Sequence, residues 1–381
     1  MKSNYKRLGD LISPISIKNS DLRTTDLRGV NYQKYFMPSV ANTVGVDLST
    51  YKLIEKGQFA CNLMHVGRDE CLPIALHREE LPIIVSPAYF TFQVKDENQI
   101  LSEFLFLWFR RKEFDRQACF YTDADVRQGL IKSAFLDMEI PVPSIEEQRK
   151  IVAEYQAIEQ RIENNRCLIA TLEATAQTIY RKMFVDDIDP ENLPEGWRMG
   201  TLENITLFIS AGTIPNYAED SDCLVLGQKC NYGHTISIEK ARHHLPKASS
   251  ISCLFGDVLV NSTGDGTLGR VGLIRFEPQN LTFDSNMTLA RPLNREWIEY
   301  VFVTIMNMES FFVQICQGST NQTRLYCSMI RSTPCLIPNK ESVMNYHAAT
   351  KSIFHYQGQL EHEIIILATI QKNTLSKLSN L

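Results

Sequence analysis

The most constraining feature of this sequence is that its two halves repeat each other. The segment 57–62 (GQFACN) is matched 199 residues later by the segment 256–261 (GDVLVN), and Gly67-Arg68 is matched by Gly269-Arg270. Matched segments in the same order indicate a duplicated module. Two copies of one module in a single chain are typical of a protein that binds two similar targets at a fixed separation.

An Ile-Pro pair closes each half, at Ile140-Pro141 and at Ile337-Pro338, and a long stretch with helical character follows. In the first stretch, positions four and three residues apart alternate to form a heptad stripe. The stripe consists of Ile151, Tyr155, Ile158, Ile162, Asn165, Ile169, Leu172, Ala176, Ile179 and Met183. Ser144 with Glu147 three residues later makes a capping box. The pattern predicts a helix over residues 144–185.

The second stretch carries a less regular stripe, in which Ile353, Leu360 and Leu367 are seven residues apart. The segment 364–366 and Ile370 broaden the stripe, and Gly358 interrupts it. A long helix with a single apolar stripe needs a partner. The other helix of the same chain is the economical partner, and an antiparallel pair places one module at each end. A homodimeric coiled coil is the alternative.

Asn165 is the polar exception in the first stripe. A polar side chain at such a position costs stability and can fix the register of a coiled coil. The alternative is an asparagine that points outward at a bend of the helix. The sequence leaves these two interpretations open.

Short β-type runs and turn signals fill each module, and helical stretches follow at 101–117 and 295–316. Examples of the runs are 83–85, 89–94, 258–260 and 271–274. We therefore predict an α+β fold with two tandem globular domains and an intramolecular antiparallel helix pair, a pseudo-twofold dumbbell. The predicted segments are domain one at 1–143, helix one at 144–185, an acidic linker at 186–200, domain two at 201–340 and helix two at 341–381.

The net charge of −5 comes from the linker. Residues 186–200 hold five acidic side chains and one basic side chain, whereas the two modules are close to neutral. This distribution argues against strong non-specific binding to nucleic acid and leaves specific binding open. The chain has no run of 18 apolar residues and no apolar core of a signal peptide near Met1, so we expect a cytoplasmic protein.

One group of cysteines and histidines needs consideration as a metal site. Its members are Cys223, Cys230, His234, His243, His244 and Cys253. These spacings are too loose for a zinc ribbon or finger, so core cysteines with surface histidines are the preferred interpretation, and we expect no metal.

Motifs for catalysis are missing. The segment 264–271 has the glycine spacing of a phosphate loop, but Arg270 and Val271 stand where Lys and Ser or Thr belong. Residues 261–267 and 318–324 are instead polar loops whose amide, hydroxyl and guanidinium groups are of the kind that read base edges. Ordinary turn chemistry is the alternative. The candidate DNA-contacting residues are Asn62, His65, Arg68, Arg127, Gln128, Asn261, Thr263, Thr267, Arg270, Ser319, Asn321, Gln322 and Arg324.

Residues 140–151 (IPVPSIEEQRKI) resemble the signature that opens the first conserved helix in DNA-specificity subunits of type I restriction-modification enzymes. The segments 64–68, 72–74, 85–90 and 266–272 resemble parts of that family's target-recognition domains, and 194–198 (PEGWR) resembles the entry to the second one. The resemblance covers the whole chain. The second signature copy, 337–342, lacks the Glu-Gln pair.

The resemblance implies a non-catalytic subunit whose two recognition domains each read one half of a split, asymmetric DNA sequence. The helix pair would set the gap and dock two methyltransferase subunits, and ATP-dependent restriction subunits would join them. S-adenosylmethionine, ATP and Mg²⁺ would belong to those partners, with no cofactor in this chain. A helix of 40 residues spans ~60 Å, or roughly 17–18 base pairs, an upper bound on the gap. A coiled-coil adaptor that binds protein through degenerate recognition domains is the alternative function, and a standalone nuclease is a more distant one.

Overall fold

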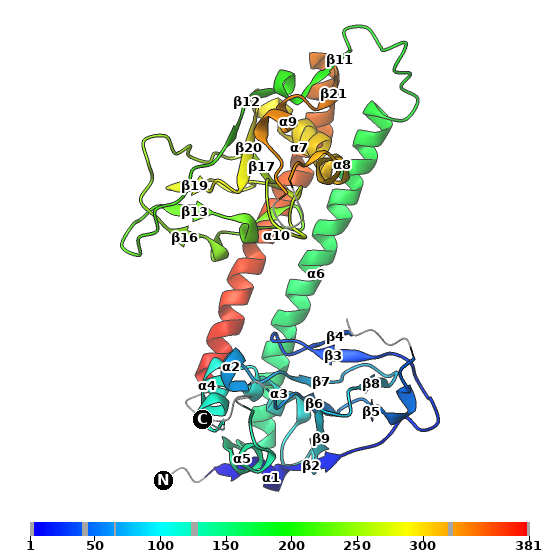
Figure 1. The fold of residues 1–381 in the computed structure, drawn as a ribbon, viewed down its shortest axis with the longest axis vertical. Helices are drawn as coiled ribbons and strands as arrows, with labels where there is room; N and C mark the ends of the chain where they lie inside the picture. Colours follow the sequence, from blue (N-terminus) through cyan, green and yellow to red (C-terminus); the bar gives the residue numbers. More distant parts are fainter. Residues whose placement is uncertain (1–3, 40–44, 65, 123–128, 319–322, 379–381) are drawn as a thin grey trace. The chain divides into compact units, whose positions relative to one another are not determined.

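The computed structural model describes the chain except for residues 1–3, 40–44, 65, 123–128, 319–322 and 379–381. The chain divides into two units, residues 1–162 with 366–381 and residues 163–365. Each unit contains one globular domain and parts of two long helices, α6 (Ile145–Phe184) and α10 (Lys340–Lys377), which are labelled in Figure 1. The five segments predicted from the sequence, which set the helices apart from the domains, remain a proposal.

The domain of unit 1 is built on a four-stranded antiparallel sheet with the order β2-β9-β6-β7. Its strands are β2 (Ile12–Ile15), β9 (Phe90–Val94), β6 (Phe59–Cys61) and β7 (Ile74–Leu76). Because side chains alternate along a strand, Phe59 and Cys61 face the main core while Ala60 faces a second small core. Phe59 stacks on Phe92 at 4.8 Å between ring centroids.

The remaining elements of this domain surround the sheet. Two helices, α3 (Ser102–Phe109) and α4 (Lys112–Phe120), contribute to the main core. The small core is closed by the pair β5 (Lys52–Ile54) and β8 (Ile83–Val85). The other elements are β1 (Tyr5–Arg7), α1 (Leu8–Leu11), β3 (Arg28–Val30), β4 (Phe36–Pro38), α2 (Val66–Asp69), α5 (Lys132–Asp137) and β10 (Glu139–Pro141).

The domain of unit 2 repeats this sheet, with the order β12-β20-β17-β18 followed by β15 and β14. Its strands are β12 (Thr206–Ala211), β20 (Met287–Pro292), β17 (Val258–Asn261), β18 (Val271–Leu273), β15 (Thr235–Ile236) and β14 (Asn231–Tyr232). Val258 and Val260 face the core that contains α7 (Ile298–Met306), and Leu259 faces a separate core. The two halves that repeat in the sequence therefore share the order of their strands, and matched side chains on those strands point to the corresponding side of the sheet.

A second, three-stranded sheet covers the other face, with the order β16-β13-β19. The remaining elements are β11 (Arg198–Thr201), β13 (Leu224–Leu226), β16 (Arg242–His243), β19 (Leu281–Phe283), α8 (Glu309–Ile315), α9 (Cys327–Arg331) and β21 (Pro334–Ile337). The α+β class predicted from the sequence is confirmed for both domains.

Each predicted helical stretch before the Ile-Pro pair is two helices rather than one. The stretch 101–117 breaks between α3 and α4, where Arg111 is extended, with φ −74° and ψ 139°. Its guanidinium lies 3.8 Å from the ring centroid of Trp108, so a buried cation–π contact accompanies the break. The stretch 295–316 likewise breaks between α7 and α8. Periodicity alone did not reveal either break.

The heptad stripe of α6 is confirmed, because every one of its members is buried or half-buried while Glu154, Arg161 and Glu163 are exposed. On α10, Ile353, Leu360 and Leu367 are also buried or half-buried. The expectation that Ile366 and Ile370 broaden this stripe is wrong, since their side chains are 47% and 44% exposed.

The two stripes meet within each unit, and the pairing is antiparallel. In unit 2, Asn165 Nδ2 donates to Glu363 Oε2 at 2.9 Å, and Gln357 Nε2 donates to the carbonyl oxygen of Ile169 at 3.2 Å. In unit 1, Leu375 packs against the core that contains Tyr155. The predicted intramolecular pair is therefore confirmed. Asn165 faces inward and bonds across the pair, as a residue that fixes register would.

Corresponding caps start the two long helices. The backbone N–H of Glu147 donates to Ser144 Oγ at 3.3 Å, and the backbone N–H of Ser342 donates to Asn339 Oδ1 at 2.9 Å. Both satisfy an otherwise unpaired helix donor. The second signature copy therefore keeps its cap although its sequence has diverged.

Gln148 and its counterpart on α10, Val343, lie in different surroundings. Its side chain is fully buried, donates to the carbonyl oxygens of Gln99 and Pro143, and accepts from the backbone N–H of Leu101. Val343, four residues after the cap of α10 as Gln148 is four after Ser144, instead enters an apolar core. This glutamine joins α6 to its own domain, so its replacement says little about docking of partners.

No helix in the described part of the chain combines the length and the apolar character needed to cross a membrane.

Candidate nucleic-acid interface

Polar side chains gather at one end of the sheet in unit 2. They come from the loop 262–270 between β17 and β18, from the 3-10 turn η3 (Gln228–Cys230) and from the turn before β20. Gln228 Nε2 donates to Thr263 Oγ1, and Thr263 Oγ1 donates to Asn286 Oδ1 at 3.0 Å. Thr267 Oγ1 lies 3.4 Å from Gln228 Oε1. Side-chain hydrogen bonds thus hold the loop in one conformation.

Arg324, in the described part of the second polar segment, lies beside the turn before β20, and the next residue contacts the loop 262–270. The backbone N–H of Leu325 donates to the carbonyl oxygen of Ser262 at 2.8 Å. Arg324 Nη2 donates to the carbonyl oxygen of Ser285 at 2.9 Å. Arg324 is therefore held close to the loop 262–270 and to the turn before β20.

Arg270 is held at the end of the same loop. Its Nη2 donates to the carbonyl oxygen of Gly266 at 2.7 Å, and its guanidinium lies 5.5 Å from the ring centroid of Tyr232. Tyr232 is 72% exposed. An arginine fixed in this way loses little conformational freedom when it binds a planar acceptor.

Asn261 differs from the other candidates because its side chain is fully buried. Its Oδ1 accepts from Asn231 Nδ2 at 3.2 Å, and its Nδ2 donates to the carbonyl oxygen of Gln228 at 3.3 Å. The amide has no access to a ligand at the surface. Asn261 therefore enters the proposal below only as a residue that supports the loop.

The first domain places two candidates in the corresponding β6–β7 loop. Asn62 Oδ1 accepts from the backbone N–H of Met64 at 3.1 Å. Arg68 Nε donates to Asp69 Oδ1 at 2.7 Å, and the hydroxyl of Tyr32 donates to Asp69 Oδ2 at 3.1 Å. Arg68 is exposed, so this ion pair contributes little to stability and its guanidinium stays accessible.

Six candidates lie outside the described residues. They are His65, Arg127, Gln128, Ser319, Asn321 and Gln322.

Sequence reasoning missed Gln228, Tyr232 and Asn286. The first two precede the loop by 30 residues or more and lie near it because β15 pairs parallel with β18. The sequence signal for this part of the site was Gly233, since glycine favours a tight turn. Gly233 lies in the turn between β14 and β15 and has a φ of +59°. A turn beside an exposed aromatic side chain does not by itself indicate where that side chain lies.

Two members of the cysteine and histidine cluster are in contact, since Cys223 Sγ lies 3.6 Å from His244 Nε2. Cys230 and Cys253 are buried in an apolar core. His244 is buried rather than on the surface, which corrects the expectation for this histidine, and its Nε2 lies 2.6 Å from Thr282 Oγ1. Burial lowers its pKa. Among the described residues, no group of three or more His, Cys, Asp or Glu side chains is arranged to hold a metal ion.

His234 joins the second domain to α6. Its Nδ1 lies 2.8 Å from Glu173 Oε1 on α6, and its Nε2 lies 3.4 Å from Glu309 Oε1 on α8. Hydrogen bonds to Glu173 and then Glu309 raise the pKa of His234 to about 9. The charged histidine therefore contributes to stability most strongly in neutral and acidic solution.

This gives a pH prediction. A raised pKa contributes stability that is complete below the ordinary value of 6.5 and is lost as pH rises through about 9. The difference in free energy of unfolding between the wild type and His234→Gln should therefore shrink from about pH 6.5 to about pH 9. Urea unfolding of both proteins across this range measures it. A difference that does not change with pH would contradict the assignment.

Comparisons with known proteins agree with this architecture. Residues 66–174 match the sequence profile of the family described as "Type I restriction modification DNA specificity domain". The type I restriction enzyme MjaIX specificity subunit of Methanocaldococcus jannaschii is 26% identical over 306 residues, which cover 73% of this chain and 68% of that protein.

A solved structure shares the fold over nearly the full length. The S subunit of the type I restriction-modification system from M. genitalium has a TM-score of 0.59 and 14% identity, covering 98% of this chain and 95% of that chain. The profile match, the relative's sequence and the shared fold agree with the repeated recognition-type domains and the paired helices. The chain is therefore similar, in part of its sequence and in its fold, to DNA specificity subunits of type I restriction-modification systems.

Proposed function

We propose that this chain reads a bipartite, asymmetric DNA sequence, with one half read by each recognition domain. The observation that carries the proposal is the repeated strand order, β2-β9-β6-β7 and β12-β20-β17-β18. Each copy places a polar loop with an arginine between corresponding strands, Arg68 in the first and Arg270 in the second. The same scaffold with different loop residues supports two half-sites of different sequence.

The proposed contacts follow from side-chain chemistry. Arginine pairs with the two major-groove acceptors of guanine, and asparagine or glutamine pairs with adenine. Arg270 and Arg324 offer guanidinium groups, and Gln228 and Thr263 offer polar groups beside them. Asn62, Thr267 and the six candidates outside the described residues stay in the proposal as candidates for contact with DNA. Near-neutral domains favour few phosphate contacts and therefore a shallow dependence of affinity on salt.

The proposed assembly follows from the family. Two methyltransferase subunits would dock on the helix pair and methylate adenine with S-adenosylmethionine, and ATP-dependent restriction subunits would join them. Catalysis would reside in these partners and not in this chain. The α6–α10 pair would act as a ruler, because both helices contribute residues to both units. A protein-binding adaptor remains the alternative, because burial of Gln148 bears only on the missing glutamine and not on the exposed Glu147.

Arg270→Ala is expected to weaken reading of one half-site only. The loss should be about 1–3 kcal/mol if the guanidinium contacts a base. Competition binding of the complex with its methyltransferase, using DNA libraries randomised in one half-site at a time, measures the loss. Arg68→Ala should give the same loss for the other half-site.

Arg23→Ala is the matched control, because Arg23 is an exposed arginine paired with Glu55, which precedes β6, whereas the β6–β7 loop follows β6. It should leave both half-sites unchanged. If Arg270→Ala instead weakens binding equally for all sequences and reduces the salt slope by about one, the contact is to a phosphate.

A further inference from the structure

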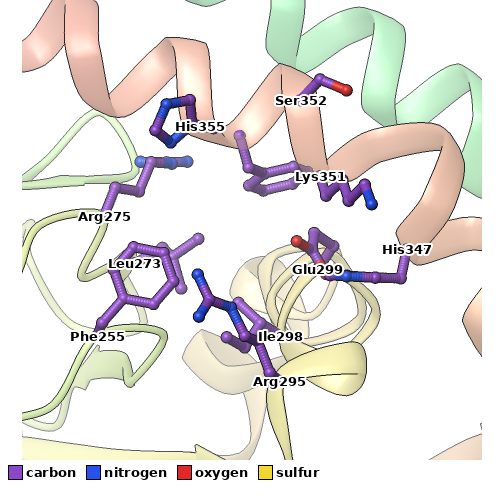
Figure 2. Close-up of a pocket in the computed structure, with 11 residues that line it drawn as sticks. Phe255, Leu273, Arg275, Arg295, Ile298, Glu299, His347, Lys351, Ser352 and His355 are labelled. Carbon is purple, nitrogen blue, oxygen red and sulfur yellow. The ribbon is translucent and has the colours of Figure 1, made fainter.

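Unit 2 contains a cavity of about 440 Å³ between α10 and the start of α7. Figure 2 shows its walls. His347, Lys351 and His355 come from α10, and Arg295 and Glu299 come from the 3-10 turn η5 (Arg295–Trp297) and from α7. Phe255, Leu273 and Ile298 supply apolar surface. All of these residues belong to one unit.

The charges around the cavity do not balance. Arg275 Nη1 lies 2.8 Å from Glu361 Oε1 and forms an ion pair with it. His347 Nδ1 lies 2.7 Å from Glu299 Oε2. Within the described residues, no ion pair involves Arg295 or Lys351, and both are exposed. Arg295 has its guanidinium 5.5 Å from the ring centroid of Phe255, and its charge acts on the pKa of Glu299 without forming an ion pair with it. Two unpaired cations at the mouth of a partly apolar cavity favour an anionic group on an apolar neighbour.

The corresponding cavity of unit 1 serves as an internal comparison. This cavity encloses about 320 Å³. Arg78 occupies the position in unit 1 that Arg275 occupies in unit 2, and each guanidinium lies over a phenylalanine ring. There Glu97 and Glu103 line the wall, and Lys56 is paired with Glu80. The excess of positive charge is therefore particular to unit 2 and not a by-product of the repeated fold.

The position of the cavity separates it from the proposed DNA surface. Phe255 precedes β17 and Arg275 follows β18, whereas the loop 262–270 joins the opposite ends of these two strands. A strand of four residues spans about 13 Å. The cavity also opens beside α10, one of the helices to which the proposed function assigns the methyltransferase. A carboxylate on a protein partner thus suits it better than a DNA phosphate.

We propose that this cavity is a docking site for an acidic segment of the methyltransferase subunit. The segment would place an Asp or Glu carboxylate between Arg295 and Lys351, with apolar side chains beside it on Phe255 and Leu273. The proposal rests on the proposed function, because it names the contact that one docked subunit makes. It concerns only the cavity of unit 2.

The test uses the full chain co-expressed with a type I methyltransferase subunit from the same organism. Reversing both charges, Arg295→Glu with Lys351→Glu, should weaken binding of the methyltransferase by about tenfold. Lys247→Glu changes an exposed lysine of the same unit that lies outside the helix pair, and it should leave binding unchanged. Carbodiimide coupling, which joins an amine directly to a carboxylate, should link Lys351 to an Asp or Glu of the methyltransferase.

Three results would overturn the inference. The double variant could bind the methyltransferase like the wild type while the circular dichroism of both is the same. Lys351 could stay equally reactive towards an acylating reagent in the free chain and in the complex. DNA, rather than the methyltransferase, could protect Lys351. In each of these cases the proposed function stands if adenine methylation persists, whereas failure of the wild-type chain to bind any methyltransferase would contradict both.

Discussion

Replacing Arg275 with alanine is expected to destabilise unit 2 by about 3–5 kcal/mol. The Arg275 side chain is 3% exposed, and its Nη1 lies 2.8 Å from Glu361 Oε1, whose side chain is 11% exposed. The guanidinium also lies 5.1 Å from the ring centroid of Phe302 and 5.6 Å from that of Phe354. This one side chain joins the end of β18 to α7 and α10.

The expected loss comes mostly from the carboxylate that would remain. Burial already raises the pKa of Glu361, and Arg275 is the main group that opposes this effect. Without the arginine, Glu361 would be a buried charge with no cation, or would take up a proton. The cost of leaving one charge unpaired exceeds the net contribution of the pair itself.

A double variant separates these two contributions. Arg275→Met combined with Glu361→Leu removes both charges and should recover most of the stability lost in the single variant. Urea unfolding followed by circular dichroism measures all three proteins. A loss below about 1 kcal/mol for Arg275→Ala would show that the pair is not buried as described.

Removing one matched heptad from each long helix is expected to shorten the unread gap between the two half-sites by up to about three base pairs. The suitable segments are 160–166 in α6 and 362–368 in α10. These deletions remove Asn165 and Glu363 together, so neither is left without its partner across the pair. They keep Glu159 and Glu361, which anchor each helix to its own domain. Seven residues also preserve the phase of the stripe.

The measurement is the methylated motif of the shortened protein in complex with its methyltransferase. Both half-sequences should stay the same while the gap between them shrinks. Deleting a heptad from α6 alone is the control, because it breaks the antiparallel register and should abolish specific methylation. An unchanged gap in the variant with both deletions would contradict the proposal that the length of the helix pair sets the gap.

Regularities along the sequence predicted the helices and the repeat well. The alternating spacing of four and three residues in α6 has a direct physical cause, because only such positions stay on one face of a helix. The matched segments 57–62 and 256–261 lie on or next to β6 and β17, which occupy the same place in the two sheets. Buried strands and helix stripes depend on local pattern, so a sequence reports them.

Contacts between distant segments were not predictable in the same way. The pairing of Arg275 with Glu361 spans 86 residues, and Gln228 reaches Thr263 across 35. Gly358 looked like an interruption of the α10 stripe, yet a Cβ there would lie 2.8 Å from the carbonyl oxygen of Arg275. The glycine permits close approach of α10 to the strand end. Nothing in the local sequence distinguishes this use of glycine from a weak helix position.

The most direct test of the central claim is a map of modified adenines. The chain would be expressed with its neighbouring methyltransferase gene in a host that lacks adenine methylation, and the genome read by single-molecule sequencing. Two recognition domains of shared fold but different loops predict one motif of two unlike half-sequences with a fixed gap. A stable complex that leaves no new methylated motif, or a motif without a gap, would contradict the account.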